Sequence, residues 1–151
     1  MSRFSKILVP IDFTPHSAEA VRCAVDLAGR SDSEVVLAYV YEPADYPLPE
    51  GYIVYTPEQF ARMTEEIQKR IEAARRDAEA AGARRVATRL LQGSPAQAIL
   101  ELAGEERFDL IVMGTHGRTG VGRWVMGSVA EKVVRGAPTA VLTVKLPAGS
   151  A

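Results

Sequence analysis

The sequence has little cysteine, no excess of charge and no long hydrophobic run. Cys23 is the one cysteine among 151 residues, so an internal disulfide is excluded. Its place in an apolar helical pattern favours a buried side chain over a reactive thiol. The 18 basic and 19 acidic residues leave a net charge of −1, whereas nucleic-acid-binding domains usually carry a basic excess. No apolar run approaches the roughly 20 residues that span a bilayer. We therefore expect a cytoplasmic protein with neither nucleic acid nor membrane as a partner.

The rest of the composition is that of an ordinary globular chain, with 47% hydrophobic and 25% charged residues. Residues 1–151 are expected to form a single domain. Short runs rich in Ile, Leu and Val alternate with helical patterns, as is typical of parallel strands buried on both faces. We expect strands at Lys6–Ile11, Glu34–Val40, Arg85–Leu91, Phe108–Met113 and Thr139–Lys145. The alternation predicts an α/β fold, an open doubly wound parallel sheet with helices on both faces, of Rossmann-like type.

Four helices are expected, and each begins at a hydroxyl residue suited to an N-terminal cap. A capping side-chain oxygen accepts a hydrogen bond from one of the free N–H groups of the first turn. Three of these residues precede a proline, which is favoured at the first helical position. The caps are Thr14, Thr56, Ser94 and Ser128. The spacing of Ser128 to Glu131 also predicts a capping box.

The second expected helix is long and amphipathic, with an apolar stripe from Phe60 to Ala81. Its opposite face carries acid–base pairs four residues apart, among them Glu66 and Arg70, as in a solvated surface. The preceding residues 41–56 hold four of the five tyrosines, three prolines and three acids. Because this segment shows no periodicity, we expect a long ordered loop or lid.

The most informative segment runs from Gly114 to Gly127, GTHGRTGVGRWVMG, and Ser128 follows it. It holds five of the twelve glycines and no acidic residue, and it links an expected strand to an expected helix. Glycine allows backbone N–H groups to approach an anion closely, and the helix N-terminus favours negative charge. The segment therefore predicts a phosphate site.

Two common nucleotide motifs do not fit this segment. Gly117 and Gly122 have the glycine spacing of a Walker A loop, but Arg123 and Trp124 stand where Lys and Ser or Thr are required. A dinucleotide-binding loop would follow the first strand rather than the fourth. Without a Walker lysine or an evident general base, we expect at most slow ATP hydrolysis and assign no catalytic residue.

Asp12 stands at the end of the first expected strand. In open α/β sheets the ligand lies outside the carboxyl ends of the strands, where the strand order reverses. If the first and fourth strands are neighbours there, Asp12 faces the glycine segment and could serve a divalent metal or a ribose hydroxyl. The alternative is a turn residue that bonds its own backbone before the Thr14 cap.

The chain resembles the universal stress protein family over nearly its whole length. Gly114-x2-Gly117-x9-Gly127-Ser128 fits the nucleotide-binding signature of its ATP-binding members. The opening ILVPIDFTPHSAEAVRCAVDLA looks like the family's first strand, acidic turn and first helix. The ending DLIVMGTHGRTGVGRWVMGSVAEKVVRGAPTAVLTVK looks like its last two strands with the loop between them. The resemblance implies a five-stranded sheet in the order 3-2-1-4-5, with ATP between the first and fourth strands.

The resemblance also implies which residues would bind ATP. The adenosine and metal side would be formed at the first two strand ends by Pro10, Ile11, Asp12 and Val40. Ribose and phosphate contacts would come from Met113, Gly114, His116, Gly117, Gly127, Ser128 and Val129. Asp12 would hold Mg²⁺ as part of MgATP. Ala130 departs from the threonine of some ATP-binding members, which would remove one phosphate hydrogen bond.

The expected function is an ATP-binding regulatory or stress-response protein with an unknown protein partner. The segment 139–145 carries little charge at a sheet edge, which invites pairing with another chain, and the resemblance likewise implies a homodimer through this strand. Two alternatives stay open. One is a slow ATP hydrolase or adenylating enzyme of the related nucleotide α-hydrolase group, and the other is a dimerisation module without nucleotide.

Overall fold

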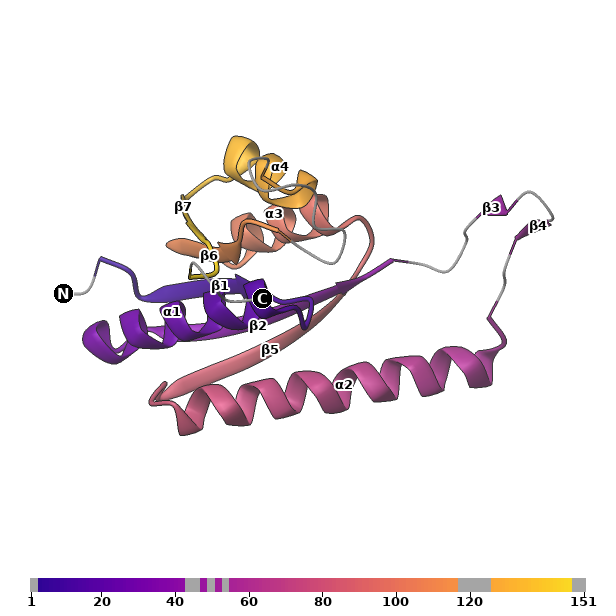
Figure 1. Ribbon diagram of the computed structural model, residues 1–151, viewed down its shortest axis with the longest axis horizontal. Coiled ribbons are helices and arrows are strands. Elements are labelled where there is room, and N and C mark those ends of the chain that lie inside the picture. Colours follow the sequence, from indigo (N-terminus) through magenta and orange to yellow (C-terminus); the bar gives the residue numbers. More distant parts are fainter. Residues whose placement is uncertain (1–2, 43–46, 49–50, 53–54, 117–125, 148–151) are drawn as a thin grey trace.

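The computed structural model describes residues 3–42, 47–48, 51–52, 55–116 and 126–147. It shows a parallel sheet between two layers of helices (Figure 1). The sheet strands are β1 (Lys6–Pro10), β2 (Glu34–Tyr41), β5 (Arg85–Gln92), β6 (Leu110–Gly114) and β7 (Ala140–Val144). The helices are α1 (Pro15–Ser31), α2 (Pro57–Ala80), α3 (Pro95–Glu105) and α4 (Ser128–Gly136).

The sheet has the order β5-β2-β1-β6-β7, and every neighbouring pair is parallel. Counted among these five strands, the order is 3-2-1-4-5, which confirms the expected doubly wound α/β fold. The strand order reverses at β1, which has β2 on one side and β6 on the other. The expected strand ends agree within two residues. The largest shift is at β6, which begins at Leu110 rather than Phe108, because the chain is still leaving the turn at Arg107, whose φ is 54°.

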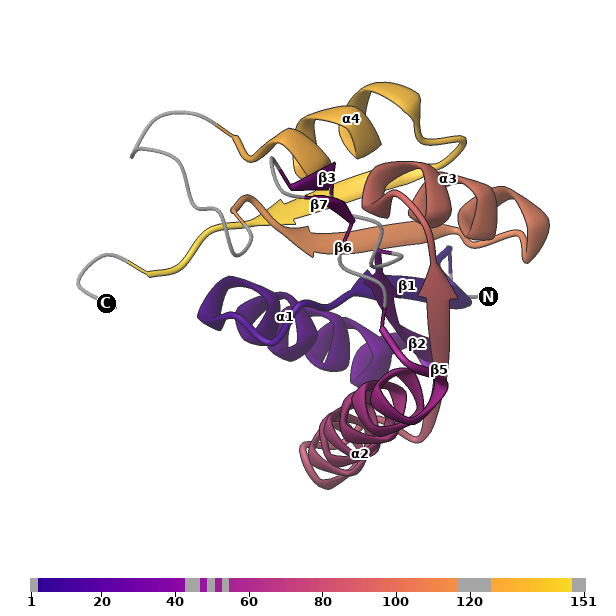
Figure 2. The ribbon, with the colours of Figure 1, turned by 90° about the vertical axis from the view of Figure 1, so that its right-hand side faces the viewer.

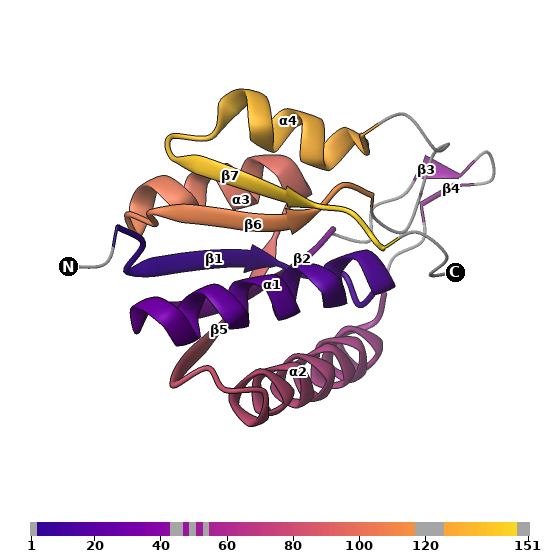
Figure 3. The same ribbon diagram turned by 60° about the vertical axis from the view of Figure 1, so that its left-hand side comes forward.

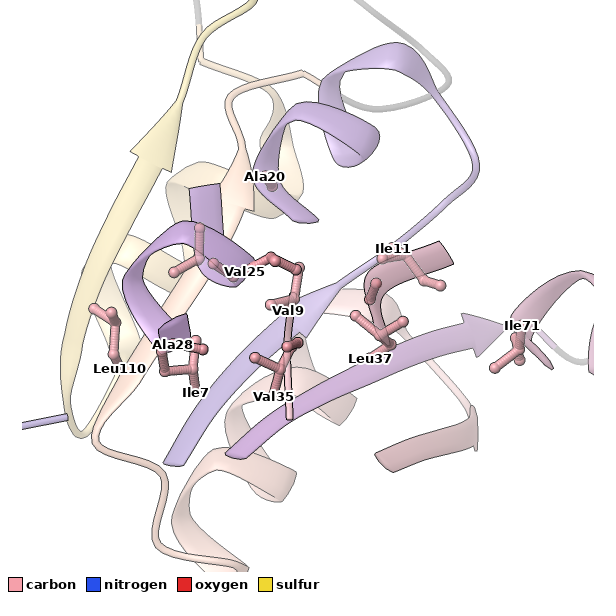
Figure 4. Packing of buried hydrophobic residues seen from close by; sticks show 14 of the residues in the cluster. Ile7, Val9, Ile11, Ala20, Val25, Ala28, Val35, Leu37, Ile71 and Leu110 are labelled. Carbon is pink, nitrogen blue, oxygen red and sulfur yellow. The ribbon is translucent and has the colours of Figure 1, made fainter. Parts of the chain in front are cut away.

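The sheet is buried on both faces because successive side chains of a strand point to opposite sides. Ile7 and Val9 pack with α1 and α2, whereas Leu8 packs with α3 and α4, and all three are 0% exposed. Figure 2 shows α1 and α2 on one side of the sheet and α3 and α4 on the other. Figure 4 shows Val35 and Leu37 of β2 beside Ile7 and Val9 in the core under α1.

Two expected caps form as the sequence predicts. The Thr14 hydroxyl accepts a hydrogen bond from the N–H of Ser17 at 3.3 Å. Thr56 and Gln59 form a complete capping box, in which each side chain accepts from the other residue's backbone N–H. Both helices have a proline in the first turn, as expected.

The other two caps differ from the prediction. Ser94 lies at the N-cap of α3 but makes no capping hydrogen bond with its side chain. The capping box at Ser128 is wrong, because the N-cap of α4 is Gly127 and Ser128 is already helical. The Gly127 carbonyl accepts the first intrahelical bond, from the N–H of Glu131 at 2.9 Å.

Part of the segment 41–56 is described. Two short strands, β3 (Pro47–Leu48) and β4 (Gly51–Tyr52), pair antiparallel within it, and the expected long ordered loop or lid stays a prediction. This ribbon lies beyond the carboxyl ends of the sheet strands, at the same end of the molecule as the start of α2 (Figure 1, Figure 3). Across the described ranges, the structure has no helix that is both apolar enough and long enough to cross a membrane.

Candidate functional site

A cavity of about 510 Å³ lies at the carboxyl ends of β1, β2 and β6, where the strand order reverses. Ten of the eleven residues expected to bind ATP line it: Pro10, Ile11, Asp12, Val40, Met113, Gly114, His116, Gly127, Ser128 and Val129. The eleventh, Gly117, lies outside the described residues, as do Arg118, Arg123 and Trp124. The topology therefore brings together residues that are more than 100 positions apart in the sequence.

Backbone hydrogen bonds set the walls of the cavity. The N–H of Ile11 donates to the carbonyl of Ala38 at 2.8 Å, which ties the end of β1 to β2. Strand β2 continues to Tyr41 and forms a wall beyond the end of β1. On the other side, the N–H of Gly127 donates to the carbonyl of Thr115 at 2.7 Å, so α4 begins beside the end of β6.

Asp12 makes the contacts of a turn residue and also lines the cavity. Its Oδ1 accepts from the N–H of Thr14 at 3.1 Å and from the Thr14 hydroxyl at 2.5 Å, as a turn residue would. The N–H of Asp12 donates to the Ser17 hydroxyl at 3.3 Å. Its Oδ2 has no hydrogen bond within the described part of the chain, and the residue lines the cavity. One carboxylate oxygen thus holds the turn and the other is available to a ligand.

His116 presents a polar atom that lacks a partner. The Thr115 hydroxyl lies 3.0 Å from Nδ1 of His116, and Thr115 is 4% exposed. Either atom can donate in this bond, so Nε2 is a donor in one tautomer of the neutral ring and an acceptor in the other. Nε2 is buried and has no hydrogen-bond partner among the residues that the structure describes. A buried polar atom without a partner is unfavourable, so a ligand that hydrogen-bonds to Nε2 would be stabilised.

Gly114 lies at a close approach of β6 to α1. A Cβ on Gly114 would lie 2.9 Å from Cβ of His16 and 3.0 Å from its carbonyl carbon. The rings of His16 and His116 are 5.3 Å apart between centroids. Glycine therefore allows the first turn of α1 to pack against the strand end that borders the cavity.

The cavity is lined by acidic rather than basic side chains. Asp12 and Glu42 line it, and within the described ranges no Lys or Arg does. The described residues also contain no cluster of three or more His, Cys, Asp or Glu side chains that could hold a metal ion. One or two carboxylates suit a metal that arrives with other ligands, as Mg²⁺ does on nucleotide phosphates.

Sequence reasoning missed part of the lining. Met63 and Ile67 were assigned to the apolar stripe of the second helix, yet both line the cavity. Tyr41 and Tyr55 also line it, and the clustering of tyrosines in the segment 41–56 was the signal that could have indicated this. Glu42 belongs to the same segment, and Ala130 was placed near the phosphates by resemblance, whereas no comparable signal marks the other lining residues, which are Ser17, Ala38, Tyr39, Pro95, Ile99 and Thr115.

The sequence is similar to characterised families and proteins. The model of the universal stress protein family matches residues 3–145. Universal stress protein MJ0531 of Methanocaldococcus jannaschii is 38% identical over 146 residues, which cover 95% of this chain and 84% of that protein. A universal stress protein of Thermus aquaticus is 36% identical over 143 residues, which cover 94% of this chain and 99% of that one.

Solved structures have the same architecture. The hypothetical protein MJ0577 is 28% identical, with a TM-score of 0.83, and the match covers 98% of this chain and 100% of the other. A universal stress protein in complex with cAMP is also 28% identical, with a TM-score of 0.73 and coverage of 97% and 100%.

Proposed function

Because this chain belongs to the universal stress protein family, we propose that it is an ATP-binding regulatory protein of the stress response. The observation that carries the proposal is the single cavity lined by ten of the eleven residues of the expected site. A similar structure holds cAMP, which supports an adenine nucleotide as the class of ligand. Changes in nucleotide occupancy would alter what the protein can contact.

The cavity suits a nucleotide in size and in the placement of its polar groups. Its volume of about 510 Å³ lies in the range of about 300–1,000 Å³ that is usual for small-molecule sites. The adenosine would lie against Pro10, Ile11 and Val40 at the ends of β1 and β2. The phosphates would lie toward Ser128 and Val129, because the first N–H groups of α4 have no intrahelical partner and favour an anion.

Asp12 is the residue that would hold Mg²⁺ bound to ATP. The metal would neutralise part of the phosphate charge in a cavity whose described lining offers no cationic side chain. We therefore expect MgATP to bind more tightly than ATP alone. Ala130 lines the same end of the cavity and is 3% exposed, so it offers no hydroxyl to the phosphates.

We propose that the site holds ATP rather than turning it over rapidly. Efficient phosphoryl transfer needs a positioned nucleophile and charge stabilisation from Lys, Arg or metal ions. Among the described lining residues, Asp12 is partly committed to the Thr14 turn, and His116 has the Thr115 hydroxyl rather than a carboxylate on Nδ1. Turnover of about 1 s⁻¹ or faster would favour an enzyme instead.

Direct identification of the ligand tests the proposal. The protein would be purified, denatured and its released nucleotides identified, and ATP, ADP, AMP and cAMP would then be titrated calorimetrically with and without Mg²⁺. We expect Asp12→Asn and Gly117→Val to weaken MgATP binding. Asp26→Asn is the matched control, because Asp26 is an exposed residue of α1 paired with Arg30 at 3.3 Å. Absence of binding at millimolar ATP would refute the proposal.

We further propose a homodimer through β7. This strand pairs with β6 on one side and with no other strand in the described part of the chain, and Leu142 on it is 38% exposed. An unprotected apolar edge favours pairing with a second copy. Leu142→Lys is expected to shift the molar mass measured by light scattering from dimer to monomer. Phe60→Lys, at an equally exposed position on α2, is the control, and a wild-type monomer would contradict the proposal.

A further inference from the structure

Phe13, which follows Asp12 directly, has a strained backbone. Its φ is 63°, in the left-handed region. Bulky residues rarely adopt this conformation, because Cβ crowds the neighbouring carbonyl oxygen. Such a conformation persists only where the surrounding structure holds it, and it is most often found at functional sites. Phe13 therefore needs an identifiable set of contacts that keeps the turn in place.

The Phe13 ring has a partner on each face. It stacks on Tyr39 of β2, with the ring centroids 5.0 Å apart and the planes 22° apart. The guanidinium carbon of Arg70 on α2 lies 4.0 Å from the centroid of the Phe13 ring. A stacked ring and a guanidinium cannot share one face at these distances, so the Phe13 ring lies between them. Both contacts are favourable, the first between aromatic rings and the second between a cation and a ring.

Arg70 makes this contact instead of the one expected from the sequence. The i,i+4 spacing predicts an ion pair of Glu66 with Arg70, but Glu66 lies 3.7 Å from the ammonium group of Lys69. Arg70 is thereby left to cover Phe13. The correction is informative because it connects α2 with the turn that carries Asp12.

Close packing alone does not hold the ring. A smaller cavity of about 290 Å³ lies between α1 and α2, and Phe13 and Arg70 are both among its lining residues, together with Ala18, Val21 and Ala74. On this side Phe13 borders open space as well as packing against the core. The two stacking contacts therefore add to the restraint that the hydrogen bonds between Asp12 and Thr14 place on the left-handed turn.

We propose that Phe13 is a positioning residue for the ligand cavity. Held between Tyr39 and Arg70, its ring keeps the Asp12–Thr14 turn in the conformation that presents the free Oδ2 of Asp12 to a bound nucleotide. Tyr39 also lines the cavity, so the same stack connects the ligand wall with α2. This inference rests on the nucleotide binding proposed above, and it assigns roles to Phe13 and Arg70, neither of which belongs to the expected site.

Two substitutions of Phe13 separate a positioning role from a structural one. Phe13→Ala removes the ring but leaves the steric penalty of a positive φ, so the turn is expected to relax and to move Asp12. Phe13→Gly removes the ring and the penalty together, so the turn can keep its conformation. Loss of a residue that orients a ligand-binding group typically weakens affinity about ten- to a hundredfold. We expect the dissociation constant for MgATP to rise about tenfold in Phe13→Ala and to change by less than about threefold in Phe13→Gly.

A double-mutant cycle tests whether Phe13 acts through Asp12. Asp12→Asn keeps an oxygen that can accept from Thr14 but removes the charge. If Phe13 acts by placing that carboxylate, Phe13→Ala in the Asp12→Asn background weakens binding by much less than it does alone. Additive losses in the cycle would overturn the mechanism.

Arg70→Ala provides a variant that leaves Phe13 in place. It removes the contact on one face of the Phe13 ring, and we expect binding of MgATP to weaken about threefold, because Asp12 is then oriented less firmly. Arg76→Ala is the control, because it removes an exposed arginine of α2 that has no ion pair within the described residues. Circular dichroism would confirm that each variant is folded. If Phe13→Ala fails to fold, the comparison of Arg70→Ala with Arg76→Ala still decides.

The outcomes also separate this inference from the proposed function. If the wild-type chain does not bind MgATP, the nucleotide proposal fails. If the wild-type chain binds and Phe13→Ala, Phe13→Gly and Arg70→Ala bind equally well, the positioning role alone is refuted. Equal losses of MgATP affinity in Phe13→Ala and Phe13→Gly would also refute the positioning role, because binding would then depend on the ring itself rather than on the turn that it holds.

Discussion

Replacing Gly114 by alanine tests how closely β6 and α1 pack beside the cavity. The added Cβ would lie 2.9 Å from Cβ, 3.0 Å from the carbonyl carbon and 3.1 Å from the carbonyl oxygen of His16. Carbon atoms prefer separations of about 3.5–4.0 Å, so the overlap is about 0.6–1.1 Å. Two of the three atoms are backbone in the first turn of α1, and no change of rotamer can move them. The helix itself has to shift.

The magnitude follows from two opposing effects. Overpacking of this kind costs about 1–3 kcal/mol. Gly114 does not have a positive φ, unlike Gly82 and Gly93, so alanine adds no backbone strain and restricts the unfolded chain, which offsets up to about 1 kcal/mol. We expect a net loss of about 1–2 kcal/mol in the free energy of unfolding. For a chain of this length that corresponds to a fall in Tm of about 2–8 °C.

Thermal unfolding followed by circular dichroism measures the effect. Gly29→Ala is the matched control, because Gly29 lies in α1 and an added Cβ there would meet nothing within 4 Å. Helix propensity predicts a gain of up to about 1 kcal/mol for the control. Binding of MgATP to Gly114→Ala is also expected to weaken, because Gly114 lines the cavity together with Asp12 and His116. A Gly114→Ala protein that melts at or above the wild-type temperature would refute the close packing.

Two further predictions concern residues that do not line the cavity. Asp109 Oδ2 accepts hydrogen bonds from the N–H and hydroxyl of Ser5 and from the N–H of Lys6, at 2.7–2.9 Å. Asp109→Ala is therefore expected to lower the free energy of unfolding at neutral pH by about 1–2 kcal/mol, as measured by urea unfolding. These bonds, led by that from the Ser5 hydroxyl, lower the pKa of Asp109 against the opposing effect of burial. The stabilisation is complete above the unfolded-state pKa and is lost as pH falls through the lower folded-state pKa. An Asp109→Ala variant whose free energy of unfolding depends on acidic pH as in the wild type would contradict this prediction. Arg89 binds Glu106 through Nε at 3.0 Å and Nη2 at 2.8 Å, a paired geometry that lysine cannot reproduce. Arg89→Lys is expected to lose about 0.5–1 kcal/mol at low salt and less at high salt, and a loss independent of salt would contradict this.

Caps and ion pairs show where local reasoning reached its limit. Thr14 and Thr56 form the predicted caps because every atom involved lies within one turn of chain. Ser128 follows the same local pattern and fails, because the N–H of Gly127 is held by the carbonyl of Thr115, which directly follows β6. The predicted ion pair of Glu66 with Arg70 fails in the same way, because Arg70 instead covers the ring of Phe13, which belongs to a turn more than 50 residues away in the sequence. Local rules therefore hold where no distant group competes for the same atoms.

By itself the sequence determined the class of fold and the number and approximate bounds of the main elements, whereas the phosphate site at the glycine segment stays a prediction. These depend on hydrophobic period and on turn residues, which act over a few positions. The strand order was inferred from resemblance to a family, and the structure confirmed it. Only the tertiary structure decided that Met63 and Ile67 of α2 line the cavity, and that Phe13 is held between β2 and α2. Such contacts arise when layers pack, and the packing of one element on another is not encoded in the pattern of either.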